Sequence, residues 1–413
     1  MGSFSTPLSG LMAAQDQLQT VSNNLANMNT DGYKDQNLTF SDIFAETGAT
    51  NGAGDPMQTG AGVAVSSTAS NFTEGNLNAT GTASNMAISG NGFFVTQSVS
   101  GMINFTRSGD FTTNNAGQLT SPNGDLLLGY PATDGIVDTS GSLTALQVGT
   151  GVAIPAVAST NIGVTANLDS DTAIGDSSIS STVTVYDSLG SAHTLAINYT
   201  KTAANTWDYS VSIPSNDVTG GTGVNTTVGS GTLNFSDAGV LTSTTNVVPI
   251  TVPALSDGAS PMTITGPFGT IAKPTITQTA SANATSATTT NGFAGGTLST
   301  YAVQPDGTIE GTFSSGKTLA LGQVALASFA NTQGLSDIGN NNYLPTAASG
   351  SPVIGLAGTG GRGTVVGGSV EESNVDIATE FAKLIVAQQA YSANAKSITT
   401  FNQVSQATLQ MLS

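Results

Sequence analysis

The first part of the chain carries apolar side chains at the spacing of a helix that packs against another helix. Two positions of a seven-residue repeat are apolar, one at Leu11, Leu18 and Leu25 and the other at Ala14, Val21 and Met28. This is the a/d pattern of a coiled coil. Thr6 followed by Pro7 predicts where the helix begins. The sequence from Asn29 to Gly32 predicts where it ends.

The carboxy-terminal part repeats the pattern over a longer stretch. One heptad position holds Ile377, Leu384, Tyr391, Ile398 and Leu412, and its partner position holds Phe381, Ala395 and Leu409. Residues 375–412 contain neither glycine nor proline, which predicts a helix about 55 Å long at 1.5 Å per residue. A narrow apolar stripe needs a partner helix. Residues 1–34 and 374–413 therefore predict a helical coiled-coil pair.

Either the chain's own core or helices of other copies could bury these stripes. Gln388, Asn402 and Ser405 occupy seam positions. Polar seam residues set register and partner choice at a cost in stability. This favours an assembly interface, and packing on the chain's own core is the alternative.

Between the two ends, the helical period gives way to the alternation of β-strands. Residues 85–95 predict strand, turn and strand, residues 105–130 continue the pattern, and similar sequence returns at 301–307 and 319–329. We infer one all-β domain made of residues 74–146 and 301–373. Residues 147–300 predict a second all-β domain inserted into it. The expected fold class is mostly β with long terminal α-helices, as two nested all-β domains and the helix pair.

Two longer motifs lie at opposite ends of the chain. Residues 21–34 read VSNNLANMNTDGYK, and residues 368–376 read GSVEESNVD. In this order they resemble the terminal signatures of the bacterial flagellar rod and hook proteins. The positions that carry the resemblance are Asn24, Leu25, Ala26, Asn27, Gly32, Tyr33, Ser373, Asn374, Val375 and Asp376.

The resemblance implies an axial structural protein whose paired terminal helices line a tube built from many copies. The polymerisation contacts would come from Leu11, Leu18, Val21, Leu25, Met28, Phe381, Leu384, Tyr391, Ile398, Leu409 and Leu412. Residues 35–73 would link the helices to the first β domain. The insertion resembles the outer domain of hook subunits, whereas rod proteins with these termini are usually shorter.

For a hook subunit, the resemblance implies a short curved tube outside the cell that passes motor torque to the filament as a flexible joint. The implied partners are other copies of the chain, the flagellar rod at one end and hook–filament junction proteins at the other. The hook cap and the type III export machinery would act during assembly. A distal rod protein and a secreted β-rich adhesin are the alternatives. The adhesin leaves the paired motifs unexplained.

Composition narrows the classes of partner. The chain has 8 Lys and Arg among 413 residues and a formal net charge of −18, so a basic surface for nucleic acid is not expected. The first basic residue is Lys34, and no apolar run approaches the roughly 20 residues of a membrane span. We therefore expect neither a cleaved signal peptide nor membrane insertion. The lack of cysteine excludes disulfides and thiol catalysis, and with the resemblance it fits type III export.

Two glycine-rich stretches match nucleotide-binding patterns. Residues 311–318 fit the P-loop letter for letter, with Lys317 as its lysine. A working P-loop leads into a helix, but residues 319–326 alternate like a strand, so we interpret the match as a turn between strands. Residues 358–363 fit the dinucleotide fingerprint without a prompt helix, which indicates a connector. We expect no enzymatic activity and no cofactor.

Metal chemistry has little support in the sequence. His193 is the only histidine, and its strand pattern predicts a position on the strand surface, so a multi-histidine site is impossible. Four residues could line a calcium loop, although its sixth position, which needs glycine, is Thr172; they are Asn167, Asp169, Asp171 and Asp176. Solvated acidic turns are the favoured interpretation, and calcium near Asp169 and Asp171 stays an open alternative.

Overall fold

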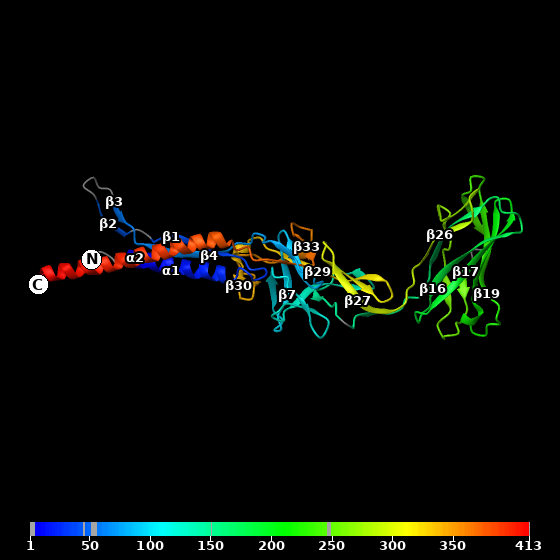
Figure 1. Ribbon diagram of the computed structural model, residues 1–413, viewed down its shortest axis with the longest axis horizontal. Helices are drawn as coiled ribbons and strands as arrows, with labels where there is room; N and C mark the ends of the chain where they lie inside the picture. Colours follow the sequence, from blue (N-terminus) through cyan, green and yellow to red (C-terminus); the bar gives the residue numbers. More distant parts are fainter. Residues whose placement is uncertain (1–4, 44–45, 51–55, 150, 246–248, 413) are drawn as a thin grey trace. The chain divides into compact units, whose positions relative to one another are not determined.

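The protein is described here from a computed structural model, which covers residues 5–43, 46–50, 56–149, 151–245 and 249–412. The described chain is mostly β-sheet with one helix near each end, α1 (Ser5–Ala26) and α2 (Ile377–Leu412), which confirms the expected fold class (Figure 1). It divides into two compact units. Unit 1 comprises residues 1–149, 300–311 and 319–413, and unit 2 comprises residues 150–299 and 312–318.

The two helices pack against each other within unit 1 (Figure 1). α1 ends at Ala26, slightly before the predicted stop at residues 29–32. The chain then turns at Gly32, which has a positive φ of 71°. α2 begins after Asp376, whose carboxylate accepts a hydrogen bond from the Thr379 N–H at 2.7 Å as an N-cap. In the described chain, neither helix is apolar over a stretch long enough to cross a membrane.

Four strands follow α1. β1 (Gln36–Asp42) pairs antiparallel with β4 (Val63–Ser70), and β2 (Glu46–Thr50) pairs antiparallel with β3 (Pro56–Thr59). Both β1 and β4 contact α1. The segment between the first helix and the β domain thus contains a two-stranded ribbon that packs beside the helix pair.

The main sheet of unit 1 joins strands from both sides of the inserted segment. β11 (Leu126–Thr133) pairs with β29 (Thr318–Ser328), and β8 (Ile103–Thr106) pairs with β31 (Asn342–Leu344). β7 (Phe93–Gln97) is buried on both faces, with Phe94 in one apolar core and Phe93 and Val95 in the other. This follows from the alternation of side chains along a strand. Two cores therefore hold the sheet from opposite sides.

The other elements of unit 1 are short and complete the edges of its sheets. They are β5 (Leu77–Ala79), β6 (Met86–Ser89), β9 (Thr112–Thr113), β10 (Leu119–Thr120), β12 (Ile136–Val137), β13 (Thr144–Ala145), β30 (Ser336–Asp337), β32 (Val353–Leu356), β33 (Thr364–Gly367), β34 (Ser369–Glu371) and a 3-10 turn at Thr332–Gly334. β34 pairs with β5, and its last residue leads towards α2.

Unit 2 encloses an apolar core of its own, in which Trp207 and Tyr199 are fully buried. Two sheets supply most of this core. The five-stranded antiparallel sheet has the order β16 (Ser177–Tyr186), β17 (Ala192–Ala203), β18 (Thr206–Ile213), β19 (Thr226–Phe235) and β20 (Leu241–Thr245), and the three-stranded sheet has the order β25 (Ile276–Thr279), β15 (Ile162–Asp169) and β26 (Ala284–Thr290). The indole N–H of Trp207 donates to Oε1 of Gln278 at 2.8 Å. The only tryptophan of the chain is therefore both buried and hydrogen-bonded, as a buried polar group must be.

The strands from Ala153 onwards that belong wholly or partly to unit 2 have these bounds: β14 (Ala153–Ile154), β15 (Ile162–Asp169), β16 (Ser177–Tyr186), β17 (Ala192–Ala203), β18 (Thr206–Ile213), β19 (Thr226–Phe235), β20 (Leu241–Thr245), β21 (Ile250–Val252), β22 (Met262–Ile264), β23 (Gly269–Thr270), β24 (Lys273–Pro274), β25 (Ile276–Thr279), β26 (Ala284–Thr290), β27 (Gly296–Val303) and β28 (Thr308–Phe313). A 3-10 turn, Ser215–Asp217, precedes β19.

Candidate functional site

The seam between α1 and α2 is built largely from small side chains. Ala14 and Val21 of α1 are buried, as is Ala387 of α2. At Gly10, an added Cβ would lie 2.9 Å from the side chain of Asn394, so the helices approach each other closely there. A narrow seam of this kind covers only one side of each helix.

The helix positions predicted from the heptad repeat fall into three groups in the described unit. Val21 is buried, five are half-buried, namely Leu11, Leu18, Leu25, Leu384 and Ile398, and four are exposed, namely Met28, Phe381, Tyr391 and Leu409. Leu412 is the last residue of α2, and its side chain lies outside the described part of the chain. The repeat thus marks both the seam and surface next to it.

Phe381, one of the partner positions predicted for α2, does not face α1. Phe381 is 48% exposed, whereas Glu380 and Ala387 are buried. Successive side chains on a helix point about 100° apart, so a seam through positions 380 and 387 turns Phe381 away from α1. Phe381 therefore lies outside the seam with α1, because α2 has apolar side chains around more of its circumference than one partner covers.

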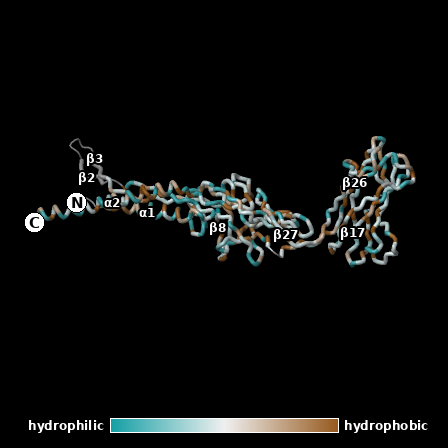
Figure 2. Tube along the Cα trace, viewed as in Figure 1, coloured by the Kyte–Doolittle hydropathy of each residue, from teal (hydrophilic) through white to brown (hydrophobic). Residues whose placement is uncertain are grey.

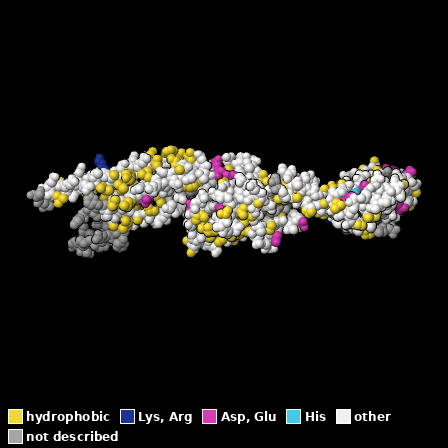
Figure 3. Space-filling view, turned by 90° about the horizontal axis from the view of Figure 1, so that it is seen from below, with side chains coloured by type: hydrophobic (Ala, Val, Ile, Leu, Met, Phe, Trp, Pro, Cys, Tyr) yellow, Lys and Arg dark blue, Asp and Glu magenta, His cyan; other side chains and the backbone are white. Residues whose placement is uncertain are grey.

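Large apolar side chains remain exposed along the helices, and we call them the uncovered helix face. Its members are Leu8, Met12, Ile377, Phe381, Ile385, Val386, Tyr391, Val404, Leu409 and Met411. Figure 2 shows hydrophobic residues along both helices, and Figure 3 shows hydrophobic side chains gathered over this end of unit 1. Every residue from Thr399 to Met411 is exposed. Exposed apolar side chains that gather in this way mark a surface for binding a partner.

A second feature, which we call the polar joint, fixes the helix pair to the strands of unit 1. It consists of buried or half-buried polar side chains from both terminal motifs, from the turn after β8 and from α2, namely Asn24, Tyr33, Lys34, Arg107, Glu371, Asn374 and Glu380. The hydrogen bonds of these residues cross between segments that lie far apart in the sequence. The joint therefore couples the orientation of the helices to the β-sheet.

Asn24 is the centre of the joint, and it is fully buried. Its Nδ2 donates to the Gln36 carbonyl at 2.9 Å and to Oε2 of Glu380 at 3.1 Å. Its Oδ1 accepts from the Gln36 N–H and from the Tyr33 hydroxyl, both at 3.0 Å. Since the side-chain amide offers two donors and one acceptor oxygen with two lone pairs, every hydrogen-bonding position of Asn24 is used. One residue thus links α1, the chain after it and α2.

Two neighbouring motif residues shape the turn out of α1. At Gly32, a Cβ would lie 2.5 Å from the Ser108 backbone nitrogen, and its own N–H donates to the Glu371 carbonyl at 2.7 Å. Only glycine fits a positive φ at such a contact. Burial, and then the charges of Asp337, Asp35 and Glu380, raise the pKa of Tyr33 to about 12. The hydroxyl is therefore a stable donor to Asn24.

A buried ion cluster lies beneath this turn. Lys34 and Glu371 pair with fully buried side chains, and Arg107 lies 3.8 Å from Oε2 of the same carboxylate. Nζ of Lys34 also donates to the Thr73 carbonyl at 2.7 Å, and the Gly75 N–H donates to Oε1 of Glu371 at 2.9 Å. Burial lowers the pKa of Lys34, and the charge and hydrogen bond of Glu371 oppose that shift.

The second motif closes the joint from the other end of the chain. Asn374 accepts from the Asp35 N–H at 2.8 Å, and its Nδ2 donates to the Asn71 carbonyl at 2.8 Å and to the Thr73 carbonyl at 3.1 Å. The hydrogen bond from the Thr379 backbone N–H holds the pKa of Asp376 below its ordinary value. Asn374 therefore fixes the entry to α2, and Asp376 caps the helix.

The remaining motif residues have smaller roles. Asn27 donates to the Asn23 carbonyl at 3.0 Å and so closes the end of α1. Ser373 accepts from the Val375 N–H at 3.4 Å. Ala26 is exposed as the last residue of α1, and Leu25 and Val375 are half-buried.

Sequence reasoning did not single out Lys34, Arg107, Glu371 or Glu380. Lys34 and Glu371 lie within the two quoted motifs. Because only 8% of the residues in the chain are charged, a charged residue inside a motif was the available signal for a functional position. What the sequence could not show is their pairing, because 337 positions separate them. The pairing becomes visible only when both ends of the chain meet.

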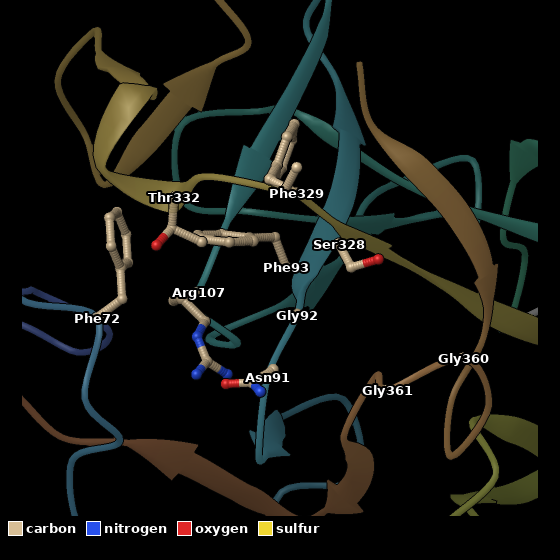
Figure 4. A pocket seen from close by; sticks show the side chains of 11 residues that line it. Phe72, Asn91, Gly92, Phe93, Arg107, Ser328, Phe329, Thr332, Gly360 and Gly361 are labelled. Carbon is tan, nitrogen blue, oxygen red and sulfur yellow. The ribbon is translucent and has the colours of Figure 1, made fainter. Parts of the chain in front are cut away.

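A cleft of about 420 Å³ lies on unit 1 beside Arg107 (Figure 4). Phe72, Phe93 and Phe329 line part of it, with edge-to-face contacts between Phe93 and each of the other two rings. The guanidinium of Arg107 is already engaged, since it donates to the carbonyls of Ile88 and Gly90. The described lining residues include no Asp, Glu, His, Lys, Cys or Tyr, so the cleft brings together no general acid and base.

The nucleotide-binding matches form turns. β28 ends at Phe313 and β29 begins at Thr318, with Gly316 at a φ of 77° between them. This confirms the interpretation of residues 311–318 as a turn between strands, in which Lys317 lies over the Phe293 ring at 5.3 Å. Residues 358–363 connect β32 to β33, which confirms the connector.

His193 is not on the strand surface as predicted. It is 7% exposed, and its ring nitrogens lie 3.0 Å from Oδ2 of Asp217 and 3.1 Å from Oδ2 of Asp187. Side chains alternate between the two faces of β17, and His193 lies on the buried face. Burial of the ring is tolerated there because carboxylates from neighbouring loops form hydrogen bonds with it. Burial opposes its protonation, but the hydrogen bonds to Asp217 and Asp187 outweigh burial and raise its pKa above the ordinary value.

The four residues considered for calcium make local contacts instead. Oδ1 of Asp169 accepts from the Asp171 N–H at 2.9 Å, and Oδ1 of Asn167 accepts from the Thr279 hydroxyl at 2.9 Å. Among the described residues, the acidic side chains of this segment do not gather into a metal-binding group. The turn around Asp169 is therefore a hydrogen-bonded acidic turn.

Comparison with known proteins gives matches along nearly the whole chain. Four family models match: "Flagella basal body rod protein" at residues 4–34, "Flagellar hook protein FlgE/F/G D1 domain" at 87–167, "Flagellar basal body protein FlaE D2 domain" at 159–293, and "Flagellar basal body rod FlgEFG protein C-terminal" at 366–411. The first and last of these contain the two terminal motifs.

Similar proteins include hook proteins from several bacteria. The flagellar hook protein FlgE of Salmonella typhimurium is 34% identical, covering 97% of this chain and 98% of its own length, and that of Treponema pallidum is 32% identical, covering 97% of each. The solved structure of the Helicobacter pylori flagellar hook protein FlgE2 has a TM-score of 0.53 at 15% identity. It covers 71% of this chain and 98% of its own. At that identity, the structure shows a shared fold.

Proposed function

Because this chain belongs to the flagellar hook protein family, we propose that it is the structural subunit of a bacterial flagellar hook. Many copies assemble into a short curved tube outside the cell. The tube transmits motor torque to the filament as a flexible joint. The role is mechanical and requires neither a catalytic step nor a cofactor.

The observation that carries this function is that one subunit has both the uncovered helix face and the polar joint. A lone copy leaves large apolar side chains of both helices in water, and their burial would contribute roughly 25 cal/mol per Å². Other copies of the chain offer the complementary surface. The heptad positions that the helix pair leaves exposed, including Phe381 and Leu409, are then contacts between copies.

The polar joint makes that contact mechanically useful. A helix pair that swivelled freely would transmit little torque to the β-sheet. Buried hydrogen bonds and a buried ion pair prevent swivelling, because breaking them would leave polar groups buried without partners. The joint thus holds each subunit's helices in a fixed relation to its own strands in unit 1.

Family membership supports the remaining proposed partners. We propose that the assembled tube meets the flagellar rod at one end and the hook–filament junction proteins at the other. The hook cap and the type III export machinery act during assembly. A distal rod protein is disfavoured, because hook proteins match over nearly the full chain. A secreted adhesin would not explain the terminal matches.

Changing exposed positions of α2 tests this function. The double variant Ile385→Gln and Val386→Gln replaces two exposed apolar residues, 54% and 63% exposed, with good helix formers. We expect the monomer to keep its circular dichroism and thermal midpoint, and to lose assembly into tubes seen by electron microscopy. The matched control is Val99→Gln, since Val99 is 94% exposed on the turn after β7. Tubes formed normally by the double variant would refute the helix-based mechanism.

A further inference from the structure

The loops around His193 converge on one point in unit 2. Asp187 follows β16, Asp217 ends the 3-10 turn Ser215–Asp217, and Asp257 lies between β21 and β22. The loops are fastened to one another. The Ser256 N–H donates to the Asp217 carbonyl at 2.9 Å, and the Ser260 N–H donates to the Ser188 hydroxyl at 3.2 Å. The imidazole of His193 therefore sits among carboxylates whose positions the fold fixes.

Backbone amides hold two of these carboxylates by one oxygen and leave the other oxygen directed at the ring. Oδ1 of Asp187 accepts from the N–H groups of Leu189 and Ser191 at 2.8 and 2.9 Å. Oδ1 of Asp257 accepts from the Ala259 N–H at 3.0 Å. The Oδ2 atoms of Asp187 and Asp257 lie 3.1 and 3.9 Å from Nε2 of His193.

The second ring nitrogen of His193 fixes the orientation of the imidazole. Nδ1 lies 3.0 Å from Oδ2 of Asp217. When the neutral ring donates its proton there, the lone pair of Nε2 points towards two carboxylate oxygens, and either a second ring proton or a cation would pair with them. The His193 side chain is 8% exposed, so little water reaches the ring. A cation between Nε2 and the two oxygens would satisfy all three atoms.

The charges around His193 also favour a bound cation. Three carboxylates surround one imidazole, so even a protonated ring leaves two negative charges uncompensated. Among the described residues, no Lys or Arg forms an ion pair with Asp187, Asp217 or Asp257. Buried or partly buried charge of one sign is costly without a counter-charge. A divalent cation would supply it.

We propose that Asp187, His193 and Asp257 form a binding site for a divalent transition-metal ion of the Zn²⁺ class, with Asp217 orienting the imidazole. The three donor atoms all lie within 4.8 Å of one another. Tetrahedral zinc with ligands at 2.0–2.2 Å needs donors about 3.4 Å apart, which the 3.1 and 3.9 Å separations bracket. The hydrogen bond from a ligating histidine to a carboxylate is the usual support for such sites.

The nitrogen ligand decides the class of metal. Calcium and magnesium prefer all-oxygen ligand sets, whereas imidazole with carboxylates suits zinc and similar ions. Asp257 is 30% exposed by its side chain, so the fourth position faces solvent and would hold water. The ion would clamp the three loops of unit 2, and its effect is structural.

Metal titration of the tag-free full-length chain, stripped beforehand with a chelator, tests the proposal. We expect one Zn²⁺ per chain by calorimetry, a tetrahedral Co²⁺ absorption spectrum, and a higher thermal midpoint with Zn²⁺, followed by the fluorescence of Trp207. Asp257→Asn should weaken binding at least tenfold, and Asp217→Asn should weaken it roughly 10–100-fold. The matched control, Asp171→Asn, changes an exposed carboxylate elsewhere in unit 2 and should bind as the wild type does.

Two results would overturn the proposal. One is the absence of saturable Zn²⁺ and Co²⁺ binding, which would leave a protonated imidazole as the link between the loops. The other is equal binding by the wild type, Asp257→Asn and His193→Gln. Because Asp257 is partly exposed, its variant should fold even if His193→Gln does not, and binding by Asp257→Asn then decides the matter.

Discussion

At the level of single residues, the polar joint pairs most of its buried groups, and Oε2 of Glu371, which accepts no hydrogen bond from the described residues, lies 3.8 Å from Arg107. Asn24 uses every hydrogen-bonding position, and Lys34 and Glu371 are paired with no exposed side-chain surface. The asparagines, glycine and tyrosine of the terminal motifs are needed for specific hydrogen bonds and for one turn with positive φ. Replacing any of them leaves a buried partner unpaired or a backbone contact too close.

Glu371→Gln should therefore destabilise unit 1. The change leaves Lys34 buried without its counter-charge, and breaking a buried pair in this way costs about 3–5 kcal/mol. Urea unfolding followed by near-ultraviolet circular dichroism of the tyrosines measures it. Trp207 fluorescence reports unit 2 separately, because the chain has one tryptophan and it lies there.

The control for this change is Glu372→Gln, the same substitution one residue further along at a half-buried position. It should alter the free energy of unfolding by less than about 0.5 kcal/mol. Equal effects of the two variants would show that the ion cluster does not stabilise the joint.

Tyr33 gives a pH dependence with a definite sign. Its folded pKa is raised to about 12 from an ordinary value of 10.0, so the folded state retains its proton longer than the unfolded state. The stabilisation is complete below pH 10 and is lost as the pH rises towards 12.

Tyr33→Phe should flatten the alkaline part of the stability profile, since phenylalanine cannot ionise. At neutral pH the variant should lose about 1 kcal/mol with the hydrogen bond to Asn24. Urea unfolding across the pH range measures both effects. A variant whose alkaline loss equals that of the wild type would contradict the assignment to Tyr33.

At the level of elements, local patterns predicted more than long-range pairings. The heptads of α1 and α2, the glycine turn at 311–318 and the strands around Phe93 all follow from residues close in sequence. The side of α2 that faces α1 could not be predicted in this way. Its apolar residues cover several faces of the helix, and the sequence alone does not show which partner contacts each face. The burial of His193 was missed because its partners come from three separate loops.

Ala387→Leu should open the seam between α1 and α2. Ala387 is fully buried, and extra methylene groups in a packed site cost about 1–3 kcal/mol. The matched change, Ala382→Leu, adds the same atoms at an exposed position of the same helix and should be nearly neutral. Thermal melting of the helical circular dichroism signal compares them. A seam variant as stable as its control would mean that α1 and α2 do not pair through Ala387.

At the scale of the whole molecule, each unit has a core of its own, and unit 2 interrupts the sequence of unit 1. This organisation separates two tasks. The terminal helices and the polar joint belong to unit 1 and supply the proposed assembly surface. Unit 2 can therefore vary in sequence without changing that surface.

Immunogold electron microscopy of isolated flagella shows whether this chain builds the hook. The antibody is raised against residues 150–299 of unit 2. We expect gold along the short curved segment between the cell body and the filament. Gold confined to the straight rod beneath that segment, or to other parts of the cell surface, would contradict it.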